Sequence, residues 1–369
     1  MGMFSGRQAA IGLDIGKSSI VGVQVAGRGP SVVLKAYHER SLPEGLMFDG
    51  EVVDPVGLSV ELKVFMRESG MKGKVVNLGV GNQKVIVRQI DVPDMGEDEL
   101  RGAIEFQAQD YIPIPVEEAV LDFQVVARYS GDDGLEKQQV LLVAGQKEMI
   151  QKFLDAAKRA GLKVAGIDVT AFALIRALAP SISFVDQGAQ TGRTLGVVNI
   201  SSSVSTLVVA VDGVPKFTRI INFSHDAFTR LLVQQQGIPF EDASVLMERI
   251  GLAGPVAPDS STYSAATIEA VQSALGRVAE ELAEEIRRSV DYYQTQEFAT
   301  PVDHLLLTGR GALLRNLDAH LSEFLGILVE RGNPLLKLAR NESGVPDEIL
   351  AIQAPRLAVA VGLALDEAE

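Results

Sequence analysis

The chain has 369 residues, 47% of them apolar and 22% charged, with a net charge of −14 and no cysteine. The length suggests two or three domains, and the composition is that of an ordinary folded protein. The lack of cysteine excludes disulfides and thiolate metal sites, and the negative charge disfavours nucleic acid as a partner because like charges repel. The opening residues lack the apolar segment of a secretory signal, and the longest apolar runs are about half of a membrane span, so we expect a cytoplasmic chain without direct membrane insertion.

The first third of the chain predicts strands and one helix. Three strands are expected in β-branched, apolar runs that Gly- and Ser-rich turns separate: 10–16, 20–26 and 31–37. The helix that follows is expected to bury one face, made of Val56, Val60, Val64 and Phe65. A further strand is expected at 74–81.

Residues 84–168 have the order β-α-β-β-α-β, which is typical of a small ferredoxin-like module. Its elements are expected at 84–92, 97–109, 119–129, 138–146, 147–160 and 163–169. A helix at 170–179 and a linker at 181–194, rich in Ser, Gly and Gln, come next.

After the linker, residues 194–213 repeat the strand-turn-strand layout of residues 10–29. Aligning Asp14 with Asn199 also pairs three turn residues with three others: Gly16 with Ser201, Lys17 with Ser202, and Ser18 with Ser203. A repeat of a whole unit indicates a duplicated fold.

Residues 239–298 are expected to be mainly helical. An apolar stripe at helical spacing runs along one long helix: Val271, Leu275, Val278, Leu282, Ile286, Val290 and Tyr293. Residues 302–314 read as a buried strand, a Gly turn and a helix start, and residues 354–369 as one more apolar helix.

The stretch Gly16-Lys17-Ser18 shares its letters with the end of a Walker A loop. The upstream glycine, Gly12, is one residue too close, and a strand-like run follows Ser18 where a P-loop needs a helix. The alternatives that remain are a hairpin turn that wraps phosphate and an ordinary Ser-rich hairpin. In the first case Gly16 lets the backbone approach the anion. Lys17, Ser18 and Ser19 would then donate to phosphate, and Asp14 would hold Mg²⁺ through water.

Two such turns resemble the phosphate motifs of the actin and heat-shock chaperone superfamily: "GLDIGKSS" the first and "GVVNISSSVSTLVV" the second. "LLLTGRGALL" resembles the adenosine motif of that superfamily, and "EEIRRSVDYYQTQ" the helix that meets the ribose and base. The resemblance implies further nucleotide-binding residues: Asn199, Ser201, Ser202, Ser203, Gly309, Arg310, Gly311, Glu285 and Arg288. For Glu285 and Arg288 a solvated charged face is the alternative.

The position of the inserted module is similar to that in the cell-division protein FtsA and in the type IV pilus assembly protein PilM family. Four stretches favour the PilM family: "LPEGLMFDGEVVDP", "DELRGAIEFQAQDYIPIPVEEAVLDFQVV", "AGLKVAGIDVTAFALIRAL" and "EIRRSVDYYQTQ". An FtsA-like filament protein and a small-molecule kinase of the same superfamily are the alternatives. No carboxylate is clearly placed to act as the base that a kinase needs.

This resemblance implies a two-lobed actin-like (ribonuclease H-like) α/β fold with an inserted βαββαβ subdomain. The expected parts are 1–83 (first subdomain), 84–168 (insertion), 169–193 (return and linker), 194–240 (second subdomain), 241–300 (helical subdomain) and 301–369 (completion of the second subdomain, with a final helix).

The resemblance also implies ATP and Mg²⁺ as cofactors and a place at the inner face of the plasma membrane. The implied partner is the cytoplasmic N-terminal peptide of a bitopic, PilN-like protein, with other pilus platform proteins and the assembly ATPase as further candidates. The groove for this peptide would lie between the module and its neighbouring subdomain, near Tyr111, Ile112 and Pro113. The alternative is that this segment ends a helix and fills core.

The chain departs from the superfamily pattern where water would be positioned. Asn199 and Ser201 stand where relatives usually have Asp and Gly, and Thr170 where they often have an acidic residue. Asn lacks the charge that attracts Mg²⁺. We therefore expect ATP binding with weak or absent hydrolysis.

Overall fold

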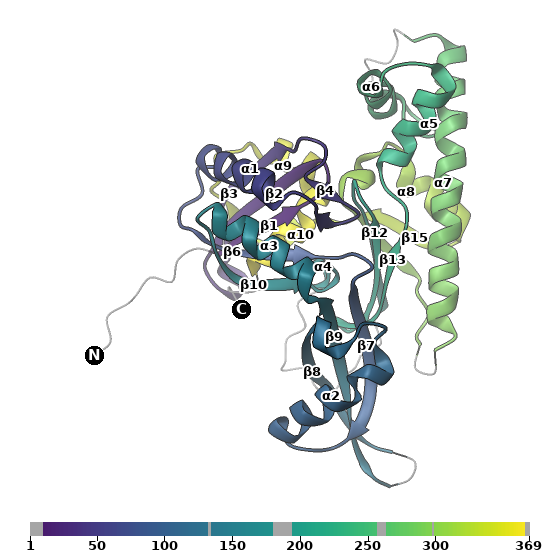
Figure 1. Cartoon of the computed structure of the whole chain (residues 1–369). Coiled ribbons are helices and arrows are strands. Elements are labelled where there is room, and N and C mark those ends of the chain that lie inside the picture. The colour runs from purple at the N-terminus through teal and green to yellow at the C-terminus, as the bar shows by residue number, and fades with distance from the viewer. Residues whose placement is uncertain (1–9, 132–133, 180–193, 257–262, 297–298, 366–369) are drawn as a thin grey trace.

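The computed structural model describes residues 10–131, 134–179, 194–256, 263–296 and 299–365. It has two lobes side by side, with a smaller module below them (Figure 1). The first lobe is built on a six-stranded sheet and the second on a five-stranded sheet. Apart from Thr194, the linker expected at 181–194 lies outside the described residues.

The first sheet has the strand order β10-β6-β1-β2-β3-β16. β1 is antiparallel to β2 and parallel to β6. The bounds are Ala10–Ile15 for β1, Ser19–Ala26 for β2, Val33–Ser41 for β3, Val75–Val80 for β6, Lys163–Val169 for β10 and Arg340–Asn341 for β16. A short hairpin, β4 (Met47–Phe48) with β5 (Glu51–Val52), follows β3.

The second sheet repeats this plan with the order β13-β12-β11-β14-β15. β11 is antiparallel to β12 and parallel to β14, as β1 is to β2 and β6. The bounds are Thr194–Ile200 for β11, Ser205–Val211 for β12, Val214–Ile221 for β13, His304–Thr308 for β14 and Leu328–Arg331 for β15. Asp14 and Asn199 are both the last residue but one of their strands, so the duplication read from the sequence places them at equivalent positions.

Helices cover both faces of the first sheet: α1 (Pro55–Glu68) and α3 (Lys147–Arg159) one face, α4 (Thr170–Leu178) and α10 (Ala358–Leu365) the other, with α9 (Asp347–Gln353) beside them. The helix expected near residue 56 is α1, and its predicted buried face is right only at Phe65, which is fully buried. Val56 and Val60 are 55% and 52% exposed, and Leu58 and Leu62 pack with Phe65 in the core instead. Two apolar stripes at helical spacing run along α1, and spacing alone does not decide which one faces a sheet.

The inserted module is smaller than expected. It consists of β7 (Val85–Pro93), α2 (Glu97–Tyr111), β8 (Ala119–Ser130) and β9 (Glu136–Gln146), with the sheet order β7-β9-β8. β10, expected as its last strand, pairs in parallel with β6 of the first lobe. α3 likewise packs in the core of that lobe. The module is therefore βαββ and not βαββαβ, because the order of elements along a chain does not say which sheet a strand joins.

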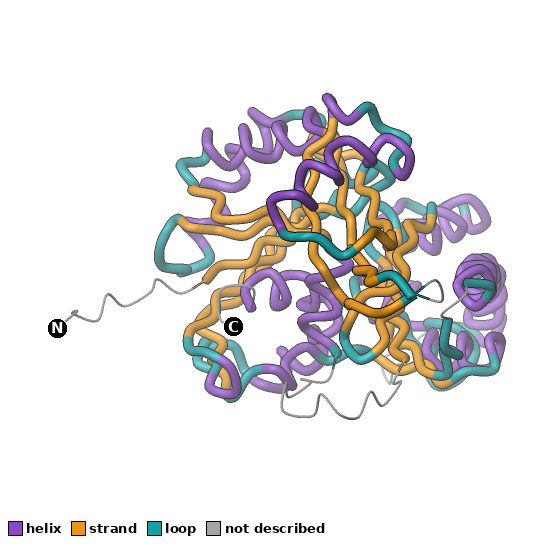
Figure 2. The backbone as a smooth tube through the Cα atoms, turned by 90° about the horizontal axis from the view of Figure 1, so that it is seen from below, coloured by secondary structure: helices purple, strands orange, loops and turns teal. Residues whose placement is uncertain are grey.

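The second lobe carries α5 (Asp226–Gln236), α6 (Phe240–Ile250), α7 (Ala265–Gln294) and α8 (Leu317–Leu325). The apolar stripe predicted for the long helix is buried at all seven positions, which confirms that reading. α7 runs along the outer edge of the lobe in Figure 1 and is seen end-on in Figure 2. The short 3-10 helices are Gly29–Ser31, Val116–Glu118, Arg310–Leu313, Pro334–Lys337 and Ala354–Leu357.

The C-terminal helix α10 lies in the core between the first sheet and α4. By length and composition the helical run Asp347–Leu365 could cross a membrane, but 67% of its apolar window is buried inside the fold. The contact with α4 is close: a Cβ at Gly362 would lie 1.9 Å from the carbonyl oxygen of Ala173. Glycine is therefore needed there for two helices to touch.

We expect Gly362→Ala to lower the free energy of unfolding by about 1–3 kcal/mol, because the added methyl group forces α4 and α10 apart. Gly276→Ala is the matched control, since nothing lies within 4 Å of a Cβ built at that position in α7. There the same change should stabilise the chain by about 0.5–1 kcal/mol. Urea unfolding followed by circular dichroism measures both. Equal effects of the two substitutions would contradict the packing described for α10.

Candidate functional site

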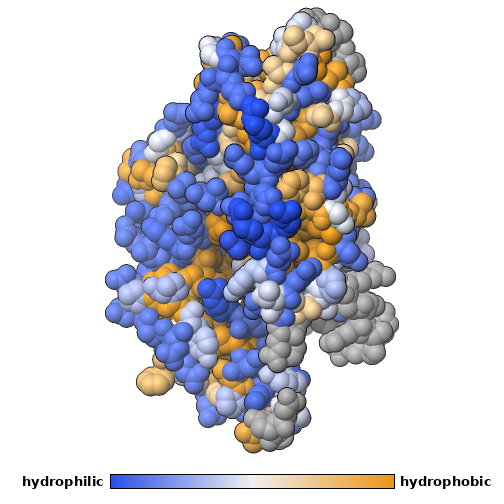
Figure 3. All heavy atoms as spheres, turned by 90° about the vertical axis from the view of Figure 1, so that its right-hand side faces the viewer, coloured by the Kyte–Doolittle hydropathy of each residue, from blue (hydrophilic) through white to orange (hydrophobic). Residues whose placement is uncertain are grey.

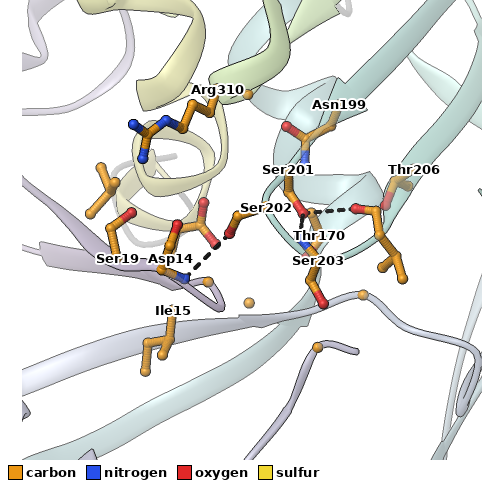
Figure 4. Close-up of a pocket in the computed structure, with 18 of the residues that line it drawn as sticks. Asp14, Ile15, Ser19, Thr170, Asn199, Ser201, Ser202, Ser203, Thr206 and Arg310 are labelled. Carbon is orange, nitrogen blue, oxygen red and sulfur yellow. Dashed lines mark hydrogen bonds between the residues drawn. The ribbon is translucent and has the colours of Figure 1, made fainter. Parts of the chain in front are cut away.

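Two turns, one from each lobe, face each other across a cavity (Figure 4). The first, residues 16–18, joins β1 to β2, and the second, residues 201–204, joins β11 to β12. The backbone N–H of Ser18 donates to Ser202 Oγ at 3.4 Å, which connects the two turns directly. Ser19 begins strand β2. A hairpin turn requires a strand at this position, whereas a Walker A loop requires a helix.

The cavity has a volume of about 800 Å³, counting the solvent at its mouth. Ten of the residues predicted to bind nucleotide line it: Asp14, Gly16, Ser18, Ser19, Asn199, Ser201, Ser202, Ser203, Gly309 and Arg310. The structure therefore brings together, from both lobes, most of the site that the sequence predicts.

Four predicted residues do not line the cavity. Lys17 turns toward α5, where its Nζ lies 3.6 Å from the Asp226 carboxylate. Gly311 packs under the second turn, and a Cβ there would meet the Ile200 side chain at 2.3 Å. Glu285 and Arg288 pair with each other at 2.5 Å on α7.

The position of Glu285 and Arg288 matches the alternative considered for them, a solvated charged face. Their side chains are 38% and 55% exposed. Figure 3 shows the side of the molecule that carries α7 as largely hydrophilic, with strongly hydrophilic residues near its middle. Charged residues at helical spacing occur on solvated faces and at ligand sites alike, so the sequence did not separate the two.

Asp14 brings an unpaired carboxyl group into the cavity. Burial raises its pKa to about 6, and no other group contributes to this shift. Within the described residues, no three or more His, Cys, Asp or Glu side chains form a cluster that could hold a metal ion. A lone carboxylate suits a Mg²⁺ ion that keeps most of its water ligands.

Two hydroxyl groups in the turns have no hydrogen-bond partner although they are buried: Ser18 Oγ and Ser203 Oγ. Ser201, in contrast, serves its own turn, because its Oγ donates to the carbonyl of Val204 at 2.7 Å and accepts from the N–H of Ser203 at 3.1 Å. Buried polar groups in native proteins usually have partners. One unsatisfied hydroxyl on each side of the cavity points to a polar ligand between the lobes.

Asn199 and Gly309 form one wall of the site. Asn199 Oδ1 accepts a hydrogen bond from Thr308 Oγ1 at 3.2 Å, so part of this amide is already engaged. Gly309 has φ = 77°, and a Cβ there would lie 2.5 Å from Asn199 Oδ1. Glycine is needed at this turn for both reasons. Asp168 pairs with Arg176 at 2.9 Å and stands apart from this wall.

One cavity residue is not predicted from the sequence: Arg356, which lines the cavity from the 3-10 helix before α10. Burial lowers its pKa, and Glu39 forms an ion pair with it. A buried guanidinium at a cavity wall suits an anionic ligand. The single Arg in a long apolar tail was its only signal. Two glycines, Gly79 near the end of β6 and Gly81 just after it, also line the cavity.

The predicted partner segment divides in the structure. Tyr111 is 37% exposed at the end of α2 and Pro113 is exposed after it. Ile112 is only 4% exposed and packs in the core of the inserted module. Ile112 therefore supports the module from within, and a partner could reach only its two neighbours.

Comparison with known proteins agrees with this architecture. A family model of the type IV pilus assembly protein PilM matches residues 12–368. A solved PilM–PilN type IV pilus biogenesis complex contains a chain that is 29% identical, with a TM-score of 0.82 and 98% of each chain covered.

More distant structures share the fold alone. The ethanolamine utilization protein EutJ of Carboxydothermus hydrogenoformans has a TM-score of 0.54 at 14% identity, covering 97% of this chain and 89% of that one. MreB5 of Spiroplasma citri bound to ADP has a TM-score of 0.51 at 12% identity, covering 97% and 95%. Both likenesses identify the two-lobed architecture as actin-like. With the family match over nearly its whole length, the chain belongs to the type IV pilus assembly protein PilM family.

Proposed function

We propose that this protein binds ATP with Mg²⁺ between its lobes and acts as a scaffold of the inner-membrane pilus platform, holding the cytoplasmic N-terminal peptide of a PilN-like membrane protein. The observation that carries the nucleotide part is the pair of unpartnered hydroxyls, Ser18 Oγ and Ser203 Oγ, on opposite sides of one cavity. The solved complex of a family member with PilN supports the partner.

In this proposal the two turns grip the phosphates through backbone N–H groups and hydroxyls. Asp14 holds Mg²⁺ through water. Arg310 and Arg356 offer N–H donors at the cavity wall, and their guanidinium groups are also paired with Glu248 and Glu39. Hydrolysis is slow or absent, because the Asn199 amide carries no charge and its oxygen is shared with Thr308. Thr170, also at the cavity, offers no carboxylate to activate water.

The scaffold would lie at the inner face of the membrane, held there by its partners and not by a span of its own. Among the described residues, the one helical run long and apolar enough to span a bilayer has two-thirds of its apolar window buried in the fold, which favours attachment through partners.

The first prediction concerns the unpartnered hydroxyls. Ser18→Ala and Ser203→Ala should each weaken ATP binding about tenfold, the worth of one hydrogen bond to a charged group. Neither should lower the free energy of unfolding, because neither hydroxyl has a partner to lose. Ser201→Ala is the control, since it removes two hydrogen bonds within its turn and should destabilise the chain. Calorimetric titration with ATP·Mg and urea unfolding measure the two quantities. Unchanged ATP affinity in both alanine variants would count against the proposed grip.

The second prediction concerns pH. With a pKa of about 6, Asp14 is about nine-tenths ionised at pH 7 and about one-tenth at pH 5. Mg²⁺ needs the carboxylate, so the enhancement of ATP affinity by Mg²⁺ should fall about tenfold between these pH values. Asp14→Asn should show little enhancement at either pH.

Without nucleotide, the contribution of Asp14 to the free energy of unfolding should change with pH in the opposite direction to the Mg²⁺ enhancement of ATP affinity. Because the pKa of Asp14 is raised in the folded chain, folding binds an extra proton between pH 4 and pH 6, and this group's contribution to stability falls as pH rises through that window. Asp14→Asn should remove that contribution. A wild-type Mg²⁺ enhancement that does not change with pH would exclude Asp14 as the Mg²⁺ residue.

The third prediction concerns the peptide. Tyr111→Ala should weaken binding of a labelled N-terminal peptide of the organism's PilN-like protein about tenfold, as expected for a contacting aromatic residue. Phe240→Ala is the matched control, because Phe240 is 49% exposed at the start of α6, and α6 lies at the opposite end of the molecule from the inserted module in Figure 1. Fluorescence polarisation compares them. Equal affinity of the two variants would place the peptide elsewhere.

A further inference from the structure

The lysine of the first turn is the one residue of that turn held outside the cavity. Its neighbours Gly16 and Ser18 line the cavity, whereas Lys17 does not. Its Nζ lies 3.6 Å from Asp226 Oδ2, and the two side chains are 36% and 18% exposed. Lys17 belongs to the first lobe and Asp226 begins α5 of the second, so this ion pair crosses between the lobes.

Asp226 is well placed to hold a cation. Burial raises its pKa, but hydrogen bonding from His225 and the positive charges of Lys17 and Arg230 outweigh that effect, and its pKa is lowered overall. The carboxylate is therefore ionised at neutral pH. As the first residue of an eleven-residue helix it also faces a favourable helix dipole.

The start of α5 is fastened to the second turn. The backbone N–H of His225 donates to the carbonyl of Ser201 at 2.8 Å. His225 is 5% exposed, and its Nδ1 lies 3.7 Å from Asp226 Oδ1. Asp226 thus has a defined place beside the second turn, with Lys17 reaching toward it from the first.

We propose that Asp226 holds Lys17 away from the phosphate position in the empty protein, and that a nucleotide must draw Lys17 off Asp226 to be bound by it. This rests on the proposed nucleotide function and names a residue that tunes it. Asp226 is a positioning residue, because it acts through Lys17 and lies outside the cavity wall. The flexible four-carbon stem of a lysine allows such a swing without backbone movement.

Two consequences follow from the geometry. Asp226 weakens ATP binding, because part of the attraction between Lys17 and phosphate is spent on breaking the ion pair. Nucleotide binding also breaks an ion pair between the lobes, that of Lys17 with Asp226. In its place, both lobes contact the same phosphates. The contact that remains between the turns is that of Ser18 with Ser202.

The test is a double-mutant cycle on ATP affinity, measured by calorimetric titration on the full chain. Asp226→Asn should tighten ATP binding about two- to fivefold, the range of a partly exposed ion pair. Lys17→Met should weaken it. In the Lys17→Met background, Asp226→Asn should have no further effect, because there is no lysine left to release. Asp226→Glu, which keeps the charge, should restore affinity close to that of the wild type.

The background variant separates this role from simple repulsion between Asp226 and phosphate. If Asp226→Asn tightens binding equally with and without Lys17, repulsion is the cause and the proposal is overturned. The pair Glu148 and Lys152, 3.0 Å apart on α3, is the control. Glu148→Gln and Lys152→Met should leave ATP affinity unchanged.

Failure of this inference is distinguishable from failure of the proposed nucleotide function. If the wild type binds ATP and Asp226→Asn binds it no better, the inference fails and the nucleotide function stands. If only Asp226→Asn binds ATP, the inference stands, and in the wild type the ion pair with Asp226 keeps Lys17 from binding phosphate. If no variant binds ATP, both fall.

Discussion

The apolar contact between the lobes fixes the relative position of the two turns that form the cavity. α4 and α10 of the first lobe pack against β11 and β12 of the second, with Ala171, Leu174, Val359 and Leu363 on one side and Val197 and Val208 on the other. This buried layer directs the ends of β1 and β11 toward one another, so that two small hairpin turns face a common cavity. Without it, the turns would be two unrelated Ser-rich hairpins.

The cavity contains buried polar groups without partners, which lower the stability of the protein when no ligand is bound. Asp14 is a carboxyl group whose raised pKa reports an unfavourable environment, and Ser18 and Ser203 have buried hydroxyls without partners. An apolar residue at each of these positions would avoid the free-energy cost of burying an unpaired polar group. These groups come from both lobes and meet in one cavity, where a bound anion with its cation would give them partners.

The duplication was the part of the fold that the sequence predicted best, because a repeated strand-turn-strand unit fixes equivalent positions without any knowledge of packing. It placed Asp14 and Asn199 correctly at matching strand ends and most of the cavity residues with them. It did not predict side-chain direction. Lys17 lies in the right turn yet turns to Asp226, a partner 209 positions along the chain that no local pattern could indicate.

The other differences have the same origin. Val56 and Val60 have helical spacing, but packing chose the neighbouring stripe of α1. β10 follows the module in the chain, yet pairs with β6. Arg356 is one charge in an apolar tail, and only the fold brings it to the cavity. Local patterns predict elements and their order, whereas tertiary contacts decide which face is buried and which distant side chains meet.

A crystal structure with Mg²⁺ and a non-hydrolysable ATP analogue tests the central claim most directly. The account predicts that the phosphates lie between residues 16–19 and 201–204, within hydrogen-bond distance of both turns, with Asp14 facing the metal through water. Phosphates that contact only one turn, or a nucleotide bound elsewhere on the molecule, would contradict it.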